Sequence, residues 1–180
     1  LLSLPGTGKK EQEGWARKRA REVLGQAARY LPGLPWKCGV TQSSCANFSL
    51  AELYFQAQAA VTYGFSFIGE RETYHWQDLG SYQLVVKDLH SPATAQFVDS
   101  QLGPLLALDK GDGQKELLDT LRELVKLEPL EKIAQRLHVH RGTVRYRRTT
   151  LAKLLERDME FGETLLNLSL AVKIWDALNG

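Results

Sequence analysis

The segment from residue 131 to residue 157 contains the residues whose types and spacing best suit a chemical task. It holds eight basic and two acidic residues, and no acidic residue occurs from residue 132 to residue 155. A solvated helix face usually alternates Glu with Lys or Arg at spacings of four, and this segment does not. Uninterrupted positive charge instead indicates contact with a polyanion, typically nucleic acid.

Apolar residues in this segment predict a helix-turn-helix. A short first helix is expected over residues 130–137, followed by a turn over residues 138–140 in which Val139 fills the corner. A second helix would then cover residues 141–157. The small alanine on the buried side of the first helix would let the two helices cross closely. That buried side consists of Ile133, Ala134 and Leu137.

The second helix would present two different faces. With Val144 pointing inward, Leu151 and Leu155 fall within about 20° of it at 100° per residue, so the three form a buried stripe. The opposite face is made of small, hydroxylated or basic residues, which suit a major groove because they can reach base edges or phosphates. This face comprises Gly142, Thr143, Arg145, Tyr146, Thr149, Thr150 and Lys153.

We therefore predict that the second helix enters the major groove of double-stranded DNA. Arg145 and Tyr146 would contact bases or adjacent phosphates, while Arg141 and Thr143 would set the register on the duplex. Free backbone N–H groups at the helix start would add to phosphate binding. The two arginines that follow Tyr146 would hold the DNA backbone. The full predicted set is His140, Arg141, Gly142, Thr143, Arg145, Tyr146, Arg147, Arg148, Thr149 and Lys153.

A helical protein-interaction or oligomerisation module without DNA binding is the alternative that the sequence leaves open. In that case the arginine-rich run would meet an acidic partner, and the last helix with Trp175 would supply an apolar contact surface. Retention on non-specific DNA at low salt is expected only of a DNA-binding protein.

The N-terminal part of the chain predicts an α+β fold. Trp36–Thr41 alternates as a strand does. Ser49 and Glu52 form a capping box that begins a helix, and Gly64 is expected to end that helix with a left-handed cap. Two short extended pieces are predicted after it, at Phe65–Ile68 and Thr73–Trp76.

From Asp78 onward the periodicity is helical, which predicts an all-α second part. Ser91 before Pro92 has the types of an N-cap and first helical residue. Residues 109–113 predict a turn, and residues 114–127 a strongly periodic helix. The predicted organisation is an α+β fragment at 1–77, connecting helices at 78–113 and a helix-turn-helix DNA-binding domain at 114–180.

Two stretches of the second part resemble a family of bacterial regulators. They are His138-Val139-His140-Arg141-Gly142-Thr143-Val144-Arg145-Tyr146-Arg147 and, upstream, Glu116-Leu117-Leu118-Asp119-Thr120-Leu121. Together they are similar to the C-terminal DNA-binding domain of PucR/CdaR-type transcription regulators. The earlier strand and helix, with Leu102-Gly103-Pro104-Leu105, resemble the degenerate GGDEF-like domain and connecting helices of that family.

The resemblance implies a promoter-binding regulator, usually a dimer or higher oligomer, that works at the nucleoid in the bacterial cytoplasm. It also implies effector sensing in a more N-terminal domain, which this sequence does not show. Three positions depart from the family pattern. Gly142 replaces an Asn that could cap the helix or touch a base. Arg148 replaces a Leu about 40° from the buried direction, so its side chain must reach outward or pair with an acid. Glu128-Pro129-Leu130 replaces a Gly-Asn pair.

Charge is also segregated along the whole chain. Residues 1–30 carry a net +4, residues 31–130 carry −5, residues 131–157 carry +6 and residues 158–180 carry −3. The basic residues from Lys9 to Arg29 are interleaved with Glu11, Glu13 and Glu22, so nucleic-acid contact and a solvated face remain equally open there. No stretch approaches the roughly 20 apolar residues of a membrane-spanning helix.

The sequence lacks the residue patterns that an enzyme site or a metal site would need. The run from Gly6 to Lys10 lacks both the first glycine and the hydroxyl residue of a phosphate-binding loop. No Gly-Gly-acidic-acidic run supplies the carboxylates of a nucleotide cyclase. Cys38 and Cys45 have no metal-binding spacing with His138 or His140, and we expect both to be reduced thiols of a cytoplasmic protein. We predict no enzyme activity and no cofactor.

Overall fold

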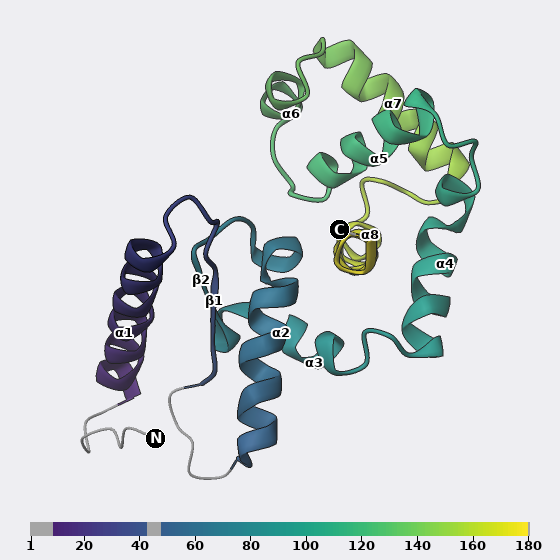
Figure 1. The fold of residues 1–180 in the computed structure, drawn as a ribbon. Helices are drawn as coiled ribbons and strands as arrows, with labels where there is room; N and C mark the ends of the chain where they lie inside the picture. The colour runs from purple at the N-terminus through teal and green to yellow at the C-terminus, as the bar shows by residue number, and fades with distance from the viewer. Residues whose placement is uncertain (1–8, 43–47, 180) are drawn as a thin grey trace. The chain divides into compact units, whose positions relative to one another are not determined.

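The structure, a computed structural model, describes residues 9–42 and 48–179, with side chains in its first helix from residue 13 onward. The chain divides into two compact units, Leu1–Asp88 and Leu89–Gly180 (Figure 1). Cys38 is a free cysteine, whereas Cys45 and most of the glycine-rich run from Gly6 lie outside the described residues. None of the described helices is both long and apolar enough to cross a membrane.

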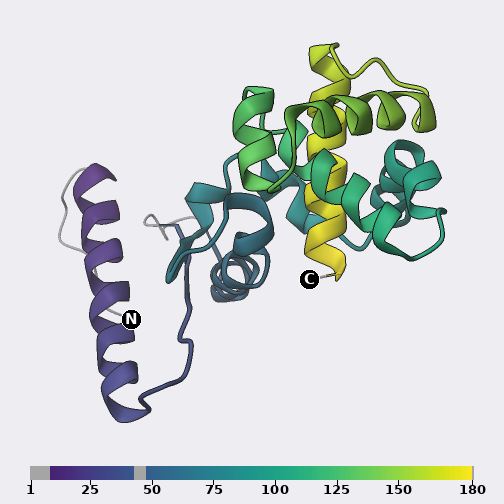
Figure 2. The same ribbon diagram turned by 90° about the horizontal axis from the view of Figure 1, so that it is seen from above.

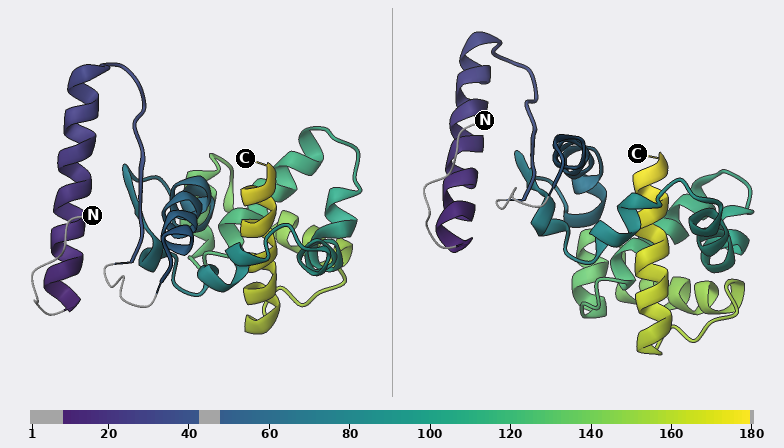
Figure 3. Two further views of the ribbon diagram at one scale, coloured as in Figure 1. Left: turned by 60° about the horizontal axis from the view of Figure 1, so that its bottom comes forward. Right: turned by 90° about the horizontal axis from the view of Figure 1, so that it is seen from below.

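The first unit is built on a β-α-β element. Strands β1 (Cys38–Val40) and β2 (Thr73–His75) pair in parallel, and helix α2 (Leu50–Ile68) connects them. Helix α1 (Lys9–Tyr30) packs on the strands from the side opposite α2, as Figures 1 and 3 show. The predicted α+β fold of the N-terminal portion is thereby confirmed. The unit ends with the 3-10 helix η1 (Trp76–Leu79) and helix α3 (Tyr82–Lys87).

Helix α2 begins where the sequence predicts. The Oγ atom of Ser49 accepts a hydrogen bond from the Glu52 N–H at 3.2 Å, and the Glu52 carboxylate accepts one from the Ser49 N–H at 2.9 Å. Two donors that would otherwise lack partners at the helix start are thus satisfied, so the predicted capping box is confirmed.

The predicted end of α2 at Gly64 is wrong. The helix continues to Ile68 and is capped by Gly69 at a φ of 82°, so Phe65–Ile68 is the last helical turn and not an extended piece. Gly64 is buried inside the helix, where a Cβ atom would lie 2.1 Å from the ring of Tyr74 on β2. Glycine is needed there because the strand packs too closely for any side chain.

A polar network ties α1 to the segment after β2. Asp78 accepts hydrogen bonds from Arg17 of α1 at 2.5 and 3.1 Å and from Arg71 at 3.3 Å. The hydrogen bond from Arg17 lowers the pKa of Asp78. His75 lies buried beside this network, and burial lowers its pKa, which favours the neutral ring. Arg17 therefore holds α1 against the rest of the unit.

The second unit is helical throughout its described residues, which confirms the predicted all-α portion. Helix α8 (Gly162–Asn179) runs through the middle of the unit and packs on α4 (Pro92–Leu106), as Figures 2 and 3 show. Helix α7 (Arg141–Leu154) contacts both α5 (Asp112–Leu124) and α6 (Leu130–Arg136). Fully buried side chains of the core include Leu102, Leu105, Leu121, Ile133, Val144, Leu151, Leu168 and Ile174.

The helix boundaries differ from the predicted ones by a few residues. Ser91 caps α4 as predicted, accepting from the Thr94 N–H at 3.2 Å. Helix α5 begins at Asp112, inside the predicted turn at 109–113, because a carboxylate in the first turn suits the positive end of the helix. Helix α7 ends at Leu154, three residues earlier than predicted, because the backbone turns left-handed at Glu156, with a φ of 51°.

We expect replacement of Glu156 by glycine to raise the free energy of unfolding of the second unit by about 0.5–1 kcal/mol. Glycine adopts a left-handed conformation without the steric cost of a Cβ, and its greater freedom in the unfolded chain offsets part of that gain. Denaturant unfolding followed by the fluorescence of Trp175 measures the change. Glu156→Ala is the control, because it removes the carboxylate but keeps the Cβ. Equal stabilisation by alanine would disprove the conformational explanation.

Candidate nucleic-acid interface

A compact turn sets the angle between α6 and α7. The N–H of Val139 donates to the carbonyl oxygen of Ala134 at 3.0 Å, and the N–H of His138 donates to that of Gln135 at 3.2 Å. These two bonds satisfy carbonyls at the end of α6, with His138 in the left-handed conformation at a φ of 54°. The chain therefore reverses within a few residues, as a helix-turn-helix requires.

The inward side of α7 is the predicted stripe. Val144 and Leu151 are fully buried and Leu155, just beyond the helix, is 6% exposed. Ile133 and Ala134 of α6 are also buried, and α6 packs directly on α7. Because this stripe fixes the rotation of α7 about its axis, it also determines which residues face away from the core.

His140 caps the start of α7, a role that its position in the sequence did not indicate. Its Nδ1 atom accepts a hydrogen bond from the Gly142 N–H at 3.0 Å. A Cβ atom on residue 142 would lie only 3.1 Å from that nitrogen, so glycine leaves the ring room to cap. The start of α7 is thus capped by the side chain at position 140.

The outward face of α7 is exposed, as predicted. Tyr146 is 72% exposed, while Thr143 and Thr150 are half-buried at the edges of the face. The hydroxyl of Thr149 donates to the carbonyl oxygen of Arg145 at 3.1 Å, so its oxygen remains available as an acceptor. The exposed residues of this face are Arg141, Gly142, Arg145, Tyr146, Thr149 and Lys153.

Two arginines of the predicted set lie at the edges of the buried stripe and pair with acids. The guanidinium of Arg147, whose side chain is 13% exposed, forms an ion pair with Glu116 of α5 at 2.5 Å. Arg147 lies about 60° from Val144 around the helix, which explains its burial. Arg148 pairs with Glu160 at 2.9 Å, so the expectation that it must reach outward or find an acid is confirmed. Both side chains are less available than Arg145.

Glu131 of α6 brings an acidic group to the basic face. Its carboxylate accepts a hydrogen bond from Arg141 at 2.8 Å, and both side chains are more than half exposed. This bond lowers the pKa of Glu131, and Arg145 lowers it further through its charge. Arg145 and Lys153, in contrast, form no ion pair within 4.0 Å with any described residue. Nothing in the spacing of the sequence indicated that Glu131 reaches this face.

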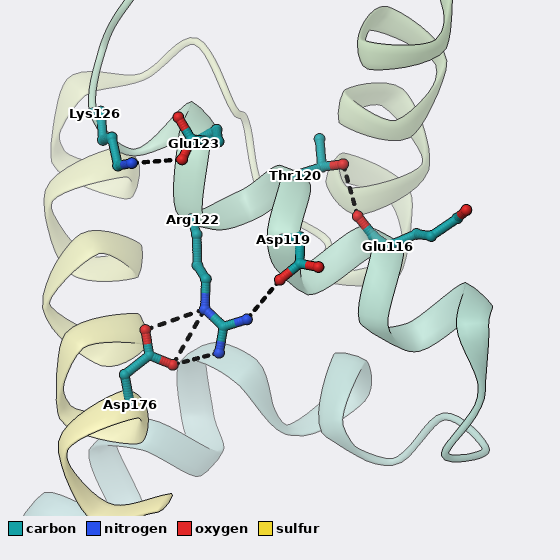
Figure 4. Close-up of polar contacts among 7 residues, drawn as sticks. All are labelled: Glu116, Asp119, Thr120, Arg122, Glu123, Lys126 and Asp176. Carbon is teal, nitrogen blue, oxygen red and sulfur yellow. Dashed lines mark hydrogen bonds and ion pairs between the residues drawn. The ribbon is translucent and has the colours of Figure 1, made fainter. Parts of the chain in front are cut away.

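Arg122 joins α5, the helix that packs against α7, to α8. Its guanidinium donates to Asp176 of α8 at 2.5 to 3.2 Å and to Asp119 of α5 at 2.7 Å (Figure 4). The hydrogen bond to Asp176 raises the pKa of Arg122, so the pair stays charged. The nearby hydroxyl of Thr120 is buried and donates to the Glu116 carbonyl oxygen at 2.7 Å. Helix α5, which supports α7, is thereby fixed to the centre of the unit.

Comparison with known proteins identifies this region. Residues 117–174 match the family model of the PucR C-terminal helix-turn-helix domain. Neither curated proteins nor solved structures gave a match. The matched residues run from α5 into α8 and include the whole of α6 and α7. The chain therefore contains, at residues 117–174, a helix-turn-helix domain of the PucR C-terminal type, which suggests DNA-binding transcriptional regulation.

Proposed function

We propose that this protein is a DNA-binding transcriptional regulator, without enzyme activity, in which α7 lies in the major groove of double-stranded DNA. The observation that carries this proposal is the division of α7 into a buried apolar stripe and an exposed face of basic, hydroxylated and small residues. A helix of this kind can lie in a groove because its exposed face offers charged groups to phosphates and hydrogen-bonding groups, the Tyr146 hydroxyl included, to base edges.

The ion pairs of α7 support different roles for its residues in DNA binding. Arg145 and Tyr146 are exposed near the start of α7 and would reach bases or adjacent phosphates. Arg141 and Thr143 would set the register, and Lys153 would hold phosphate further along the helix. Arg147 and Arg148 would contact the backbone only after leaving Glu116 and Glu160.

Duplex DNA binding measured over a range of salt concentrations tests the proposal. If Arg141, Arg145 and Lys153 each neutralise one phosphate, these three contacts should together contribute about −2.7 to the slope of log K against log salt, at roughly 0.9 per phosphate. Failure to bind any duplex at low salt would reject the regulator function. Binding to an acidic protein surface instead would favour the interaction module.

We expect Glu131→Gln to raise the affinity for duplex DNA by up to about fivefold at low salt. The change frees Arg141 from its ion pair and removes a negative charge that would face phosphates, and exposed pairs of this kind contribute at most about 1 kcal/mol. Titration of labelled duplex measures it. The matched control is Glu163→Gln, which changes the net charge equally at an exposed position on α8. Weaker binding by Glu131→Gln would contradict the idea that Glu131 competes with DNA phosphates for Arg141. It would indicate instead that the carboxylate contacts DNA directly.

We also propose that the chain is of PucR/CdaR type, with a degenerate GGDEF-like fragment at 1–77, connecting helices at 78–113 and the DNA-binding domain at 114–180. The β1-α2-β2 element supports the first assignment, because the segment alternates strands and helices as a domain of that class does. The matched helix-turn-helix supports the last. A regulator of this kind would act at the bacterial nucleoid in the cytoplasm.

We further propose that the protein binds DNA as a homodimer. One helix-turn-helix reads few base pairs, so two copies one helical turn of DNA apart are the usual solution. Apolar side chains near the end of α8 could form the contact, since Leu178 is 37% exposed and the half-buried Trp175 lies one helical turn before it. Analytical ultracentrifugation should show a concentration-dependent dimer that Leu178→Glu weakens. A monomer at the highest soluble concentration, both free and on DNA, would reject the dimer.

A further inference from the structure

The outward face of α1 carries basic side chains that the network holding this helix does not use. Lys18, Arg21 and Arg29 are exposed, and none of them forms an ion pair within 4.0 Å with any described residue. At 100° per residue the three fall within an arc of about 80°. They therefore form one stripe along the helix, which we call the α1 basic stripe.

The acidic residues of α1 whose side chains are described do not neutralise this stripe. Glu22 pairs with Arg19 at 2.7 Å, so those two charges cancel each other. Glu13 lies on the side of α1 that faces the Asp78 network, where its charge acts on Arg17 and His75. Neither Glu13 nor Glu22 therefore pairs with a residue of the stripe, and the side chain of Glu11 lies outside the described residues.

The opposite side of α1 is occupied by its own unit. Ala20 is buried, and Ala16, Leu24 and Ala27 are partly buried on that side. Because α1 packs there on β1 and β2, the helix cannot rotate its basic side chains inward. The stripe is a fixed feature of the first unit.

We propose that the α1 basic stripe is a second contact for the phosphate backbone of DNA, separate from the helix-turn-helix and independent of base sequence. This inference rests on the proposed function, because it assumes that the chain binds DNA. Lys18 and Arg29 are eleven residues apart, or about 16 Å along the helix axis, so only an extended polyanion can engage both at once. Phosphates along a duplex supply such a ligand, whereas a single small anion does not.

A lipid surface fits the stripe less well than nucleic acid does. Helices that lie in a membrane interface insert a large apolar face below their basic residues. Within the arc of the stripe, the residue between Arg21 and Arg29 is Gly25, and no large apolar side chain lies there. The exposed apolar side chains of α1, Trp15, Val23 and Tyr30, lie outside the arc of the stripe, so the stripe itself offers only charge, which suits a phosphate backbone.

The test is the salt dependence of DNA binding by the intact chain. In the variant Lys18→Gln/Arg21→Gln/Arg29→Gln, the slope of log K against log salt should become shallower by up to about 2.7, or 0.9 for each phosphate that the stripe no longer neutralises. The decrease in affinity should be the same on random duplex and on the tightest duplex selected from a random pool. The charge-conserving variant Lys18→Arg/Arg21→Lys/Arg29→Lys should keep the wild-type slope.

The matched control is Lys37→Gln/Lys87→Gln/Lys110→Gln, which removes the same charge from exposed positions outside α1 and the helix-turn-helix. A control slope as shallow as that of the α1 variant would overturn the inference, because net charge alone would explain both. If the wild-type protein binds DNA and the α1 variant shows the same salt slope, the inference about the stripe is overturned but the proposed function stands. An α1 variant that loses only its binding to phosphatidylserine vesicles would have the same consequence. Absence of wild-type DNA binding would reject the proposed function itself.

Discussion

Replacement of Leu151 by alanine is expected to lower the free energy of unfolding of the second unit by about 2–5 kcal/mol. Leu151 is fully buried on the inward stripe of α7, next to the equally buried Val144. Removing its outer carbons forfeits their burial and leaves a cavity that the surrounding helices can fill only in part, because interiors are closely packed and relax incompletely. The same loss should loosen the orientation of the outward face.

Denaturant unfolding monitored by Trp175 fluorescence measures this effect. Leu166→Ala is the matched control, because Leu166 is 68% exposed on α8 and its truncation should cost less than about 1 kcal/mol. If both changes were equally mild, Leu151 would not be in the core of the helix-turn-helix, and the assignment of inward and outward faces on α7 would be wrong.

Replacement of Arg145 by alanine is expected to weaken binding to the tightest selected duplex by about 1–3 kcal/mol, or roughly fivefold to 150-fold. Arg145 is exposed near the start of α7, and no ion pair with a described residue has to be broken before it meets DNA. Its guanidinium can therefore donate two hydrogen bonds to a guanine edge or bind phosphate without an internal cost.

Titration on selected and random duplexes separates these two roles. A larger loss on the selected duplex indicates base contact, and equal losses indicate phosphate contact alone. Arg147→Ala is the comparison variant, because Arg147 is largely buried and paired with Glu116. We expect it to change stability more than binding. If Arg145→Ala left the affinity for every duplex unchanged, Arg145 would have no place in the interface.

The sequence predicted those features that depend on local geometry. The buried stripe of α7 follows from helical periodicity, and the capping box at Ser49 and Glu52 follows from two residues three positions apart. Ser91 before Pro92 marked the start of α4 for the same reason. Such features need no knowledge of distant parts of the chain.

Features that depend on distant contacts were not predictable. Gly64 has the type of a helix terminator, but the ring of Tyr74 on β2 requires a glycine inside the helix. Arg147 belongs to a basic run, and nothing in that run indicates its ion pair with Glu116 on another helix. The acid that pairs with Arg141 comes from α6. In each case a partner from elsewhere in the fold determines the role of the residue.

Site-specific photo-crosslinking tests most directly whether the outward face of α7 lies against DNA. Benzoylphenylalanine replaces Tyr146, which is 72% exposed on that face, and in a second variant it replaces Leu166 on α8, which is 68% exposed. On irradiation with bound duplex, we predict a covalent protein–DNA product from position 146 and little from position 166. Bound duplex that crosslinks at position 166 but not at position 146 would contradict the assignment of α7 as the DNA-binding helix.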